Sequence, residues 1–308
     1  MISTLLLMAA LQAAPFEKKT YVYKEAGGVR IELDVYRDET TELRPVLVWI
    51  HGGALIMGGR GGVPRDLLDL CKSENFALVS IDYRLAPQAK LPQIIEDVQD
   101  AFRWIREKGP DTARLDPKKL VVSGGSAGGY LTLMTGICVE PKPTALVAYW
   151  GYGDVDGDWY TKPSEFYRKS KPLYEKDETL KALSPQTVTF PPDKTQAEAR
   201  QRFYLYLRQN GLWTREVTGM EPGDPRLDRY CPVRSLTQNY PPILMVHGTA
   251  DTDVPYQKSA DMARELARRS VAHELVTVPA GNHGLSGDDP VLKEAHSRAL
   301  AFIRKHLN

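Results

Sequence analysis

The chain has 308 residues, of which 42% are hydrophobic and 26% are charged, a composition typical of a soluble globular protein with a large core. Its 40 Lys and Arg residues nearly balance its 39 Asp and Glu residues, which leaves a formal charge of +1. No long run of one sign occurs, so the sequence argues against a nucleic-acid partner and favours a small molecule.

The three cysteines, Cys71, Cys138 and Cys231, are an odd number and show no CxxC spacing. This pattern argues against a disulfide framework and against a zinc site. We interpret all three as packing residues and expect no metal.

The first residues, MISTLLLMAALQAAPF, hold a short apolar stretch and small residues where a leader peptide would be cut, but no Lys or Arg. Residues 1–14 are either such a leader, which would export the protein to the periplasm or beyond, or part of an N-terminal arm over residues 1–19 of a cytoplasmic protein. No other stretch reaches the ~18–20 apolar residues of a membrane span.

From residue 20 onward, strand and helix patterns alternate along the chain. Residues 21–38 predict an antiparallel hairpin around Gly27 and Gly28. The elements predicted after it are strands at 44–50, 76–84, 118–124, 145–153, 241–248 and 273–281, and helices at 63–75, 91–109, 130–139, 255–270 and 289–307. The strands are near-continuous apolar runs, as expected when helices cover both faces of a parallel sheet.

Residues 152–238 break this alternation, because they are polar, rich in aromatics and proline, and helical in places without strands between. We interpret them as a helical cap inserted between the sixth and seventh strands. The predicted fold class is therefore α/β, with a mostly parallel eight-stranded sheet, helices on both faces and a core formed by residues 20–151 and 239–308.

A run of small residues, SGGSAGG at 123–129, lies between a predicted strand and a predicted helix. Within it, residues 124–128 match G-x-S-x-G in the strand–turn–helix context that this motif requires. Small neighbours let strand and helix come close, and the sharp turn would lift Ser126 above the sheet edge at a helix N-terminus. Ser126 is therefore the candidate nucleophile rather than part of a flexible linker.

A serine nucleophile needs an imidazole base and a carboxylate that orients the base. His283 lies in the glycine-rich loop PAGNHGLSG after the last strand, and Asp251 and Asp253 lie in HGTADTDVP after the seventh strand. We expect His283 as the base and Asp251, nearer the strand end, as the acid, with Asp253 as a solvated or helix-capping residue. The other five histidines are expected on helix surfaces or at strand ends: His51, His247, His273, His296 and His306.

An oxyanion requires backbone N–H donors near the nucleophile. HGGA at 51–54 follows the third strand, where glycines allow the backbone to approach a substrate carbonyl. The expected donors are the amides of Gly53, Ala54 and Ala127, with Gly52 as an alternate. The aromatic residues at the start of the insertion, Trp150, Tyr152 and Trp159 among them, are candidates for a substrate pocket.

Together, HGGALIMGG, DYRLAP at 82–87, LPQIIEDVQDAFRWI, GGSAGG, HGTADTDVP and GNHG resemble the hormone-sensitive-lipase-like esterases of the α/β-hydrolase superfamily and their relatives with HGGxW-type loops. The chain order of serine, acid and histidine is that of α/β-hydrolases. The resemblance implies that Ser126, Asp251 and His283 form a catalytic triad. It also implies that Asp82, Arg84 and Asp97 brace the loops under the oxyanion hole.

Two positions depart from the family pattern. Ala54 replaces the third glycine of HGGG, and HGTADTDVP is closer to the peptidase-like and feruloyl-esterase-like branches than to DxLxDE. The sequence therefore predicts a cofactor-free serine hydrolase that cleaves small carboxylic esters, with short- to medium-chain acyl groups, through an acyl-enzyme. Alternatives are an arylformamidase or amidase, a small peptidase, and a non-catalytic binding module; a homodimer is compatible with the sequence.

Overall fold

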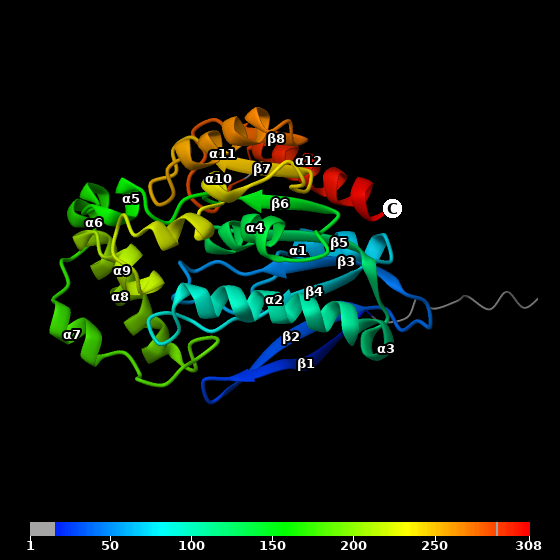
Figure 1. The fold of residues 1–308 in the computed structure, drawn as a ribbon, viewed down its shortest axis with the longest axis horizontal. Helices are drawn as coiled ribbons and strands as arrows, with labels where there is room; N and C mark the ends of the chain where they lie inside the picture. The colour runs from blue at the N-terminus through cyan, green and yellow to red at the C-terminus, as the bar shows by residue number, and fades with distance from the viewer. Residues whose placement is uncertain (1–15, 288) are drawn as a thin grey trace, which may run out of the picture.

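The computed structural model describes residues 16–287 and 289–308. Residues 1–14, interpreted from the sequence as either a leader or part of an N-terminal arm, therefore lie outside the described residues. Eight strands form one sheet in the order β1-β2-β4-β3-β5-β6-β7-β8 (Figure 1). They are β1 (Glu17–Ala26), β2 (Val29–Arg37), β3 (Arg44–Ile50), β4 (Ala77–Ile81), β5 (Leu115–Gly125), β6 (Ala145–Tyr149), β7 (Ile243–Gly248) and β8 (His273–Val278).

The pairing in the sheet follows the sequence pattern. β1 pairs antiparallel with β2 through the predicted hairpin, and β2 pairs antiparallel with β4. All other neighbours, from β4 through β3 to β8, are parallel. β4 and β6 are buried along their whole length, as expected for strands covered on both faces. The predicted mostly parallel eight-stranded sheet is confirmed.

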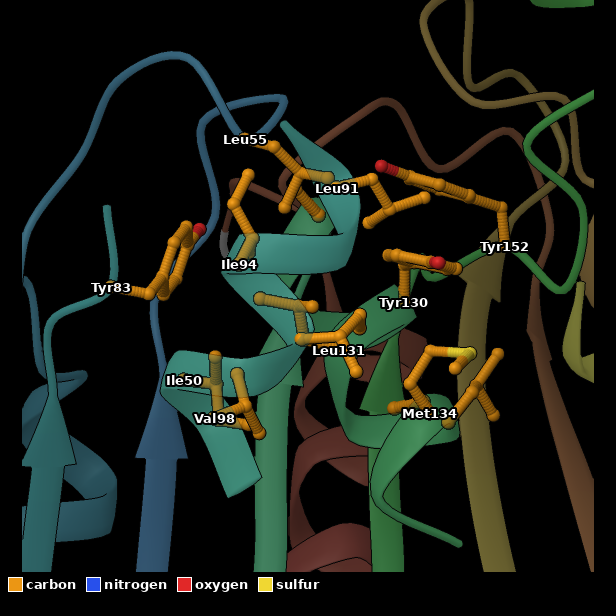
Figure 2. Close-up of a cluster of buried hydrophobic side chains, with 14 of the residues drawn as sticks. Ile50, Leu55, Tyr83, Leu91, Ile94, Val98, Tyr130, Leu131, Met134 and Tyr152 are labelled. Atoms are coloured by element: carbon orange, nitrogen blue, oxygen red, sulfur yellow. The ribbon is translucent and has the colours of Figure 1, made fainter. Parts of the chain in front are cut away.

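Helices cover both faces of this sheet (Figure 1). The helices of the core are α1 (Arg65–Ser73), α2 (Leu91–Glu107), α3 (Gly109–Ala113), α4 (Ala127–Cys138), α11 (Gln257–Arg268) and α12 (Pro290–Leu307). Side chains of α1 and α12 belong to one hydrophobic cluster, and those of α2, α4 and α11 belong to another on the opposite face. Figure 2 shows part of the second cluster, where α2 and α4 pack over the sheet.

The short helix α3 was not predicted. The sequence pattern runs one helix through to Gly109, but α2 ends at Glu107 and a new helix begins with Pro110 in its first turn. Proline is favoured at this position because it has no N–H to lose there. Arg114, with a φ of 53°, ends α3 and leads the chain into β5.

Seven short helical segments lie between β6 and β7, and no strand interrupts them in this described region. They are α5 (Asp158–Thr161), α6 (Glu165–Ser170), α7 (Lys176–Lys181), α8 (Lys194–Asn210), α9 (Trp213–Thr218), the 3-10 helix η1 (Pro225–Tyr230) and α10 (Pro232–Ser235). In Figure 1, α5 to α9 gather at one end of the sheet. The longest, α8, is capped at its N-terminus by Asp193 and ends at Gly211 in the left-handed conformation, the usual signals of a helix start and stop.

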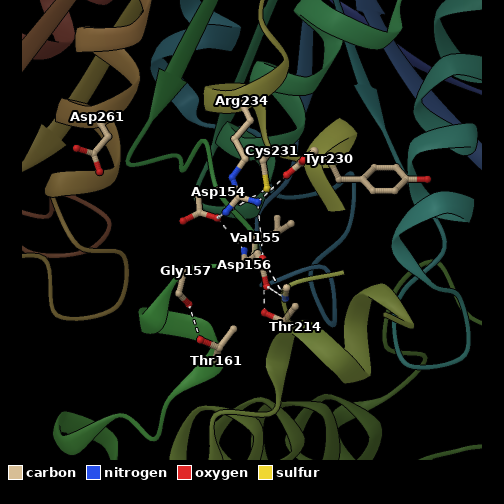
Figure 3. A network of polar contacts seen from close by, with 12 residues as sticks. Asp154, Val155, Asp156, Gly157, Thr161, Thr214, Tyr230, Cys231, Arg234 and Asp261 are labelled. Carbon is tan, nitrogen blue, oxygen red and sulfur yellow. Dashed lines mark hydrogen bonds and ion pairs between the residues drawn. The ribbon is translucent and has the colours of Figure 1, made fainter. Parts of the chain in front are cut away.

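The two ends of this insertion are joined by polar contacts (Figure 3). Arg234 of α10 lies 3.6 Å from Asp154 and 3.7 Å from Asp156, which lie at the start of the insertion. The Thr214 hydroxyl of α9 donates to the Val155 carbonyl at 2.7 Å. The segment therefore leaves and rejoins the sheet at one place.

Among the described residues, no helix combines the length and the apolar character needed to cross a lipid bilayer.

Candidate active site

Ser126 stands at the turn between β5 and α4. Its φ of 56° and ψ of −121° lie outside the regions that a non-glycine residue normally adopts. Its N–H donates to the Tyr149 carbonyl at 3.0 Å, which ties the turn to the end of β6. The residue thus has the sharp strand–turn–helix geometry of the G-x-S-x-G motif.

Steric contacts explain the glycines on either side of the serine. A Cβ on Gly128 would lie 2.0 Å from the Ile50 carbonyl oxygen, and a Cβ on Gly124 would lie 2.4 Å from the Gly128 carbonyl oxygen. Both obstacles are backbone atoms, so a change of rotamer cannot make room. The small residues are therefore required by the close approach of β5, α4 and β3.

His283 and Asp251 come together at the same edge of the sheet. Asp251 follows β7 and His283 follows β8, and the imidazole Nδ1 lies 2.7 Å from the Asp251 Oδ2. A carboxylate only accepts, so Nδ1 carries the proton in this contact. The other nitrogen, Nε2, is left to accept a proton.

Several donors surround the Asp251 carboxylate, whose side chain is fully buried. Its Oδ1 accepts the backbone N–H groups of Asp253 and Val254, each at 2.9 Å. The Nε2 of His247 lies 3.3 Å from its Oδ2. Burial alone would raise the pKa of Asp251, but the hydrogen bonds from His247 and His283 hold that pKa well below its usual range. Asp251 is therefore an ionised partner for the imidazole near neutral pH.

His283 is stabilised in its protonated form by these charges. Burial favours the neutral ring, but the hydrogen bond to Asp251 and the negative charges of Asp253 and Asp251 together raise the pKa of His283 above its ordinary value. The positive charge of Arg208 acts in the opposite direction. A raised pKa suits a residue that must take up a proton and later release it.

Asp253 differs from the solvated or capping residue that the sequence predicted. Its side chain is only 17% exposed, and its carboxylate pairs with the Arg208 guanidinium and accepts from the Tyr204 hydroxyl. Arg208 also donates to the Asp253 carbonyl at 3.0 Å. The local sequence around Asp253 does not show these partners, because both belong to α8 and lie 45 and 49 residues earlier in the chain. The Asp253 Oδ2 lies 3.6 Å from the His283 Nε2.

The loop after β3 carries the expected oxyanion donors. The Gly53 carbonyl accepts the N–H groups of Ile56 and Met57, each at 2.9 Å, which folds the loop into a tight turn. Ala54 has a φ of 56°, and its carbonyl accepts the indole N–H of Trp213 at 3.2 Å. In the part of the chain that the structure describes, the amides of Gly53 and Ala54 donate to no other group.

His51 braces this loop. Its buried ring stacks on Tyr83, with ring centroids 4.2 Å apart, and its Nδ1 lies 2.8 Å from the Gly52 carbonyl oxygen. The Tyr83 hydroxyl donates to the His51 carbonyl at 2.9 Å. Burial lowers the pKa of His51 to about 4, so the ring is neutral near neutral pH and donates from Nδ1 to Gly52.

The acidic and basic residues of DYRLAP form two ion pairs around the same loop. The Asp82 carboxylate accepts the Arg60 backbone N–H at 2.7 Å and also pairs with the Arg60 guanidinium. Arg84 makes a two-point contact with Asp97 of α2, with both distances 2.7 Å. These pairs attach the segments after β3 and β4 to the sheet and to α2.

A cavity of about 350 Å³ opens beside Ser126. The ends of β3, β5 and β6 and the helices α1 and α12 form its wall. The wall includes Trp49, Gly52, Leu67, Gly125, Tyr149 and Trp150. Trp150, one of the three aromatic pocket candidates, therefore lines this cavity.

The other two pocket candidates lie elsewhere. Tyr152 is fully buried and stacks on Tyr130 with ring centroids 5.0 Å apart (Figure 2). Trp159 stacks on Tyr160 and lies 5.4 Å from the Arg208 guanidinium carbon. Neither residue is part of the wall of the cavity beside Ser126. Tyr152 is held instead among the rings of Tyr130 on α4 and Trp213 on α9.

Two arginines of α8 contact the loops of the site, and neither was singled out from the sequence. Arg208 pairs with Asp253, and Arg200 donates to the Ile56 and Ala86 carbonyls at 2.7 and 2.9 Å. The available signal was their spacing of eight residues, at the two ends of RQRFYLYLR (200–208), whose centre is apolar. Arginine at such a spacing is common on exposed helices, so the pattern alone does not indicate burial.

Within residues 16–287 and 289–308, no group of three or more His, Cys, Asp or Glu side chains is placed to hold a metal ion. Cys71 and Cys231 are buried, Cys138 is partly buried, and all three are free thiols.

A glycine-flanked serine at this turn, with aspartate and histidine on the loops after β7 and β8, places the chain among the α/β-hydrolases. A family model described as alpha/beta hydrolase fold matches residues 47–286, and the chain belongs to that family, the hormone-sensitive-lipase-like group of hydrolases. This confirms the resemblance seen in the sequence motifs.

Individual relatives are distant. A solved protein of unknown function from Staphylococcus aureus superposes with a TM-score of 0.74 at 19% identity, over 95% of this chain and 100% of that one. Esterase 2 of Thermogutta terrifontis, solved after phosphonylation by sarin, gives a TM-score of 0.65 at 20% identity, over 98% of each chain. At these identities the two likenesses show the fold.

The curated relatives are much larger proteins. A non-reducing polyketide synthase of Penicillium rubens is 26% identical over 341 aligned residues, covering 94% of this chain. The present chain spans only 14% of the length of that relative. The similarity therefore concerns one segment of a far longer protein.

Proposed function

We propose that this hydrolase cleaves carboxylic esters through an acyl-enzyme on Ser126. The observation that carries the proposal is the 2.7 Å contact between His283 Nδ1 and Asp251 Oδ2, at the sheet edge where Ser126 occupies its strained turn. Nucleophile, base and orienting acid are the three groups that serine hydrolysis requires.

In the first step, the Ser126 hydroxyl oxygen attacks the ester carbonyl carbon while His283 Nε2 takes the hydroxyl proton. The carbonyl π bond becomes a lone pair on the oxyanion. When the oxyanion collapses, the carbon–oxygen bond to the alcohol breaks and His283 gives its proton to the leaving oxygen. Water then attacks the acyl-enzyme, with His283 again as the base, and releases the carboxylic acid.

Backbone N–H groups would hold the oxyanion. We assign this role to the amides of Gly53, Ala54 and Ala127, with Gly52 as an alternate donor. The free amides of Gly53 and Ala54 and the position of Ala127 at the start of α4 support the assignment. Donors fixed in advance stabilise the charge that develops in the transition state.

The reaction needs a small-molecule ester with a short- to medium-chain acyl group and water, and no step of it uses a cofactor. We assign residues 152–238 the role of a helical cap over a core of residues 20–151 and 239–308. The contacts of α8 and α9 with the loops after β3 and β7 support this division.

The direct test is hydrolysis of p-nitrophenyl esters, from acetate to dodecanoate, by the wild type and by Ser126→Ala. We expect turnover by the wild type and a loss of at least about 10³-fold in kcat for the variant. Matched p-nitroanilides separate ester from amide hydrolysis. Wild-type protein that turns over no ester, or a fully active Ser126→Ala variant, would refute the proposal.

A further inference from the structure

The cavity beside Ser126 lies on one defined face of the sheet. Trp49, Leu67 and Tyr149 of its wall belong to the hydrophobic cluster under α1 and α12. No residue between 152 and 238 contributes to this wall. The shape of the cavity is thus set by the sheet and two core helices, independently of the insertion.

The position of Trp150 is enforced by the backbone. Its φ of 36° lies in the left-handed region, which is unusual for a bulky residue, and its N–H is held by the Val246 carbonyl at 2.7 Å. A Cβ on Gly125 would lie 3.2 Å from the indole ring, and the ring meets His283 edge-on with centroids 6.1 Å apart. Such strain tends to occur at functional sites; here it places the indole against both the nucleophile turn and the base.

The chemistry of the wall is aromatic and mostly uncharged. Trp49, Tyr149 and Trp150 offer ring surfaces that pair well with another ring. The titratable groups on the wall other than Tyr149 are Asp66 and His296, which lie 4.0 Å apart and are 39% and 37% exposed. An apolar cavity of about 150 Å³ suffices for benzene, so about 350 Å³ holds one or two rings.

Of the two halves of an ester, the acyl half suits this cavity better. The acyl group stays bonded to Ser126 through both steps, whereas the alcohol must leave after the first. Ser126, Gly52 and Gly125 themselves form part of the wall, so a group bonded to the serine enters the cavity directly. A space bounded by core helices directly beside the serine fits the group that remains bonded to it.

We propose that the cavity between α1, α12 and Trp150 binds the acyl group of the substrate and selects an uncharged aromatic acyl group of one or two rings. This inference rests on the proposed ester hydrolysis and specifies its substrate class. Asp66 disfavours acyl groups that carry a carboxylate, because it presents a like charge at the wall.

The test compares p-nitrophenyl acetate, benzoate and 2-naphthoate with the wild type, Leu67→Trp and Asp69→Asn. Leu67→Trp fills the cavity, and we expect the ratio of kcat/KM for benzoate to that for acetate to fall at least tenfold, and further for naphthoate. Asp69 is an exposed residue of the same helix, paired with Arg65 and absent from the wall. Asp69→Asn is the control, and it should leave the kcat/KM ratios of benzoate to acetate and of naphthoate to acetate unchanged.

A second series fixes the acyl group and varies the alcohol, with ethyl and phenyl acetate. We expect Leu67→Trp to leave the ratio of kcat/KM for phenyl acetate to that for ethyl acetate unchanged. A fall in this ratio, with no change in the ratios of the acyl series, would assign the cavity to the leaving group and overturn the proposal.

Because Leu67 is buried and its variant can misfold, Asp66→Lys at the partly exposed rim provides an independent measurement. It should raise kcat/KM for p-nitrophenyl 4-carboxybenzoate relative to benzoate at least tenfold. An unchanged ratio would overturn the proposal while ester hydrolysis stands. If the wild type hydrolyses none of these esters, the proposed function itself fails and the inference fails with it.

Discussion

Asp251 and Asp253 lie two residues apart, yet the structure gives them different partners. Asp251 accepts from the His283 ring and from two backbone amides, whereas Asp253 is held by Arg208 and Tyr204. Only Asp251 contacts the imidazole nitrogen that must keep its proton during catalysis. The roles of these two carboxylates are therefore separable by substitution.

We expect Asp251→Asn to lower kcat for p-nitrophenyl esters by roughly 10³–10⁴-fold, because the amide no longer fixes the His283 tautomer. Asp253→Asn should lower kcat by no more than about tenfold, or ~1.4 kcal/mol. Steady-state kinetics on both variants checks this. Equal losses in the two variants would contradict our choice of Asp251 as the orienting acid.

The pH dependence follows from the pKa of His283, which is raised above its usual value of about 6.5. The neutral ring is the base, so activity is present above this pKa and falls as the pH drops through it. We expect the acidic limb of kcat/KM to have its midpoint above pH ~6.5.

Asp253→Asn removes one of the charges that raise the pKa of His283 and leaves Arg208 uncompensated, so the midpoint of the acidic limb should move to lower pH. Asp158→Asn, at an exposed pair with Lys162, is the matched control and should leave the profile in place. A midpoint that stays in place in Asp253→Asn would show that the negative charge of Asp253 does not raise the pKa of His283.

At the scale of elements, α8 connects the insertion to the loops of the site. Arg200 is fully buried and donates to the carbonyls of Ile56, after β3, and Ala86, after β4. Burial lowers the pKa of Arg200 to about 10, so the guanidinium is still charged at neutral pH. One side chain thus satisfies acceptors from two separate loops.

We expect Arg200→Met to lower the free energy of unfolding by about 2–6 kcal/mol, because two buried carbonyls lose their donor at about 1–3 kcal/mol each. Arg202→Met, on the same helix and only partly buried, should change it by less than about 0.5 kcal/mol. Urea denaturation of the two variants measures the difference. Similar stabilities would mean that water replaces the guanidinium at these carbonyls.

At the scale of the whole molecule, the insertion and the sheet share one hydrophobic core. Phe203, Leu207 and Trp213 of the insertion belong to the same buried cluster as Tyr130 and Ile94 of the core helices. Arg200 and Arg208 add polar links across the same boundary. The two parts therefore lack the separate cores that independent domains have.

We accordingly expect a single cooperative unfolding transition, with far-UV circular dichroism and tryptophan fluorescence giving coincident curves. Trp159 and Trp213 report the insertion, and the other three tryptophans report the core, so the double variant Trp159→Phe/Trp213→Phe serves to separate their fluorescence. A first transition that is lost in this double variant would show that the insertion unfolds on its own.

The sequence by itself determined the fold class and the order of the strands along the chain. Buried parallel strands must be apolar throughout, and turns that bring β5, α4 and β3 together must be small, so periodicity and GGSAG at 124–128 carry this information locally. Motifs that follow strand ends also indicated Ser126, His283 and Asp251, because parallel strands end at one edge.

Only the tertiary structure decided which side chains meet across long separations. Asp253 looked solvated because its partners on α8 are 45 and 49 residues away. Tyr152 looked like a pocket residue because its stacking partner, Tyr130, lies on helix α4. The cavity at Trp150 is formed by α1, α12 and the ends of three strands, β3, β5 and β6. Local patterns specify which residues are apolar or charged, whereas packing geometry specifies what each one contacts.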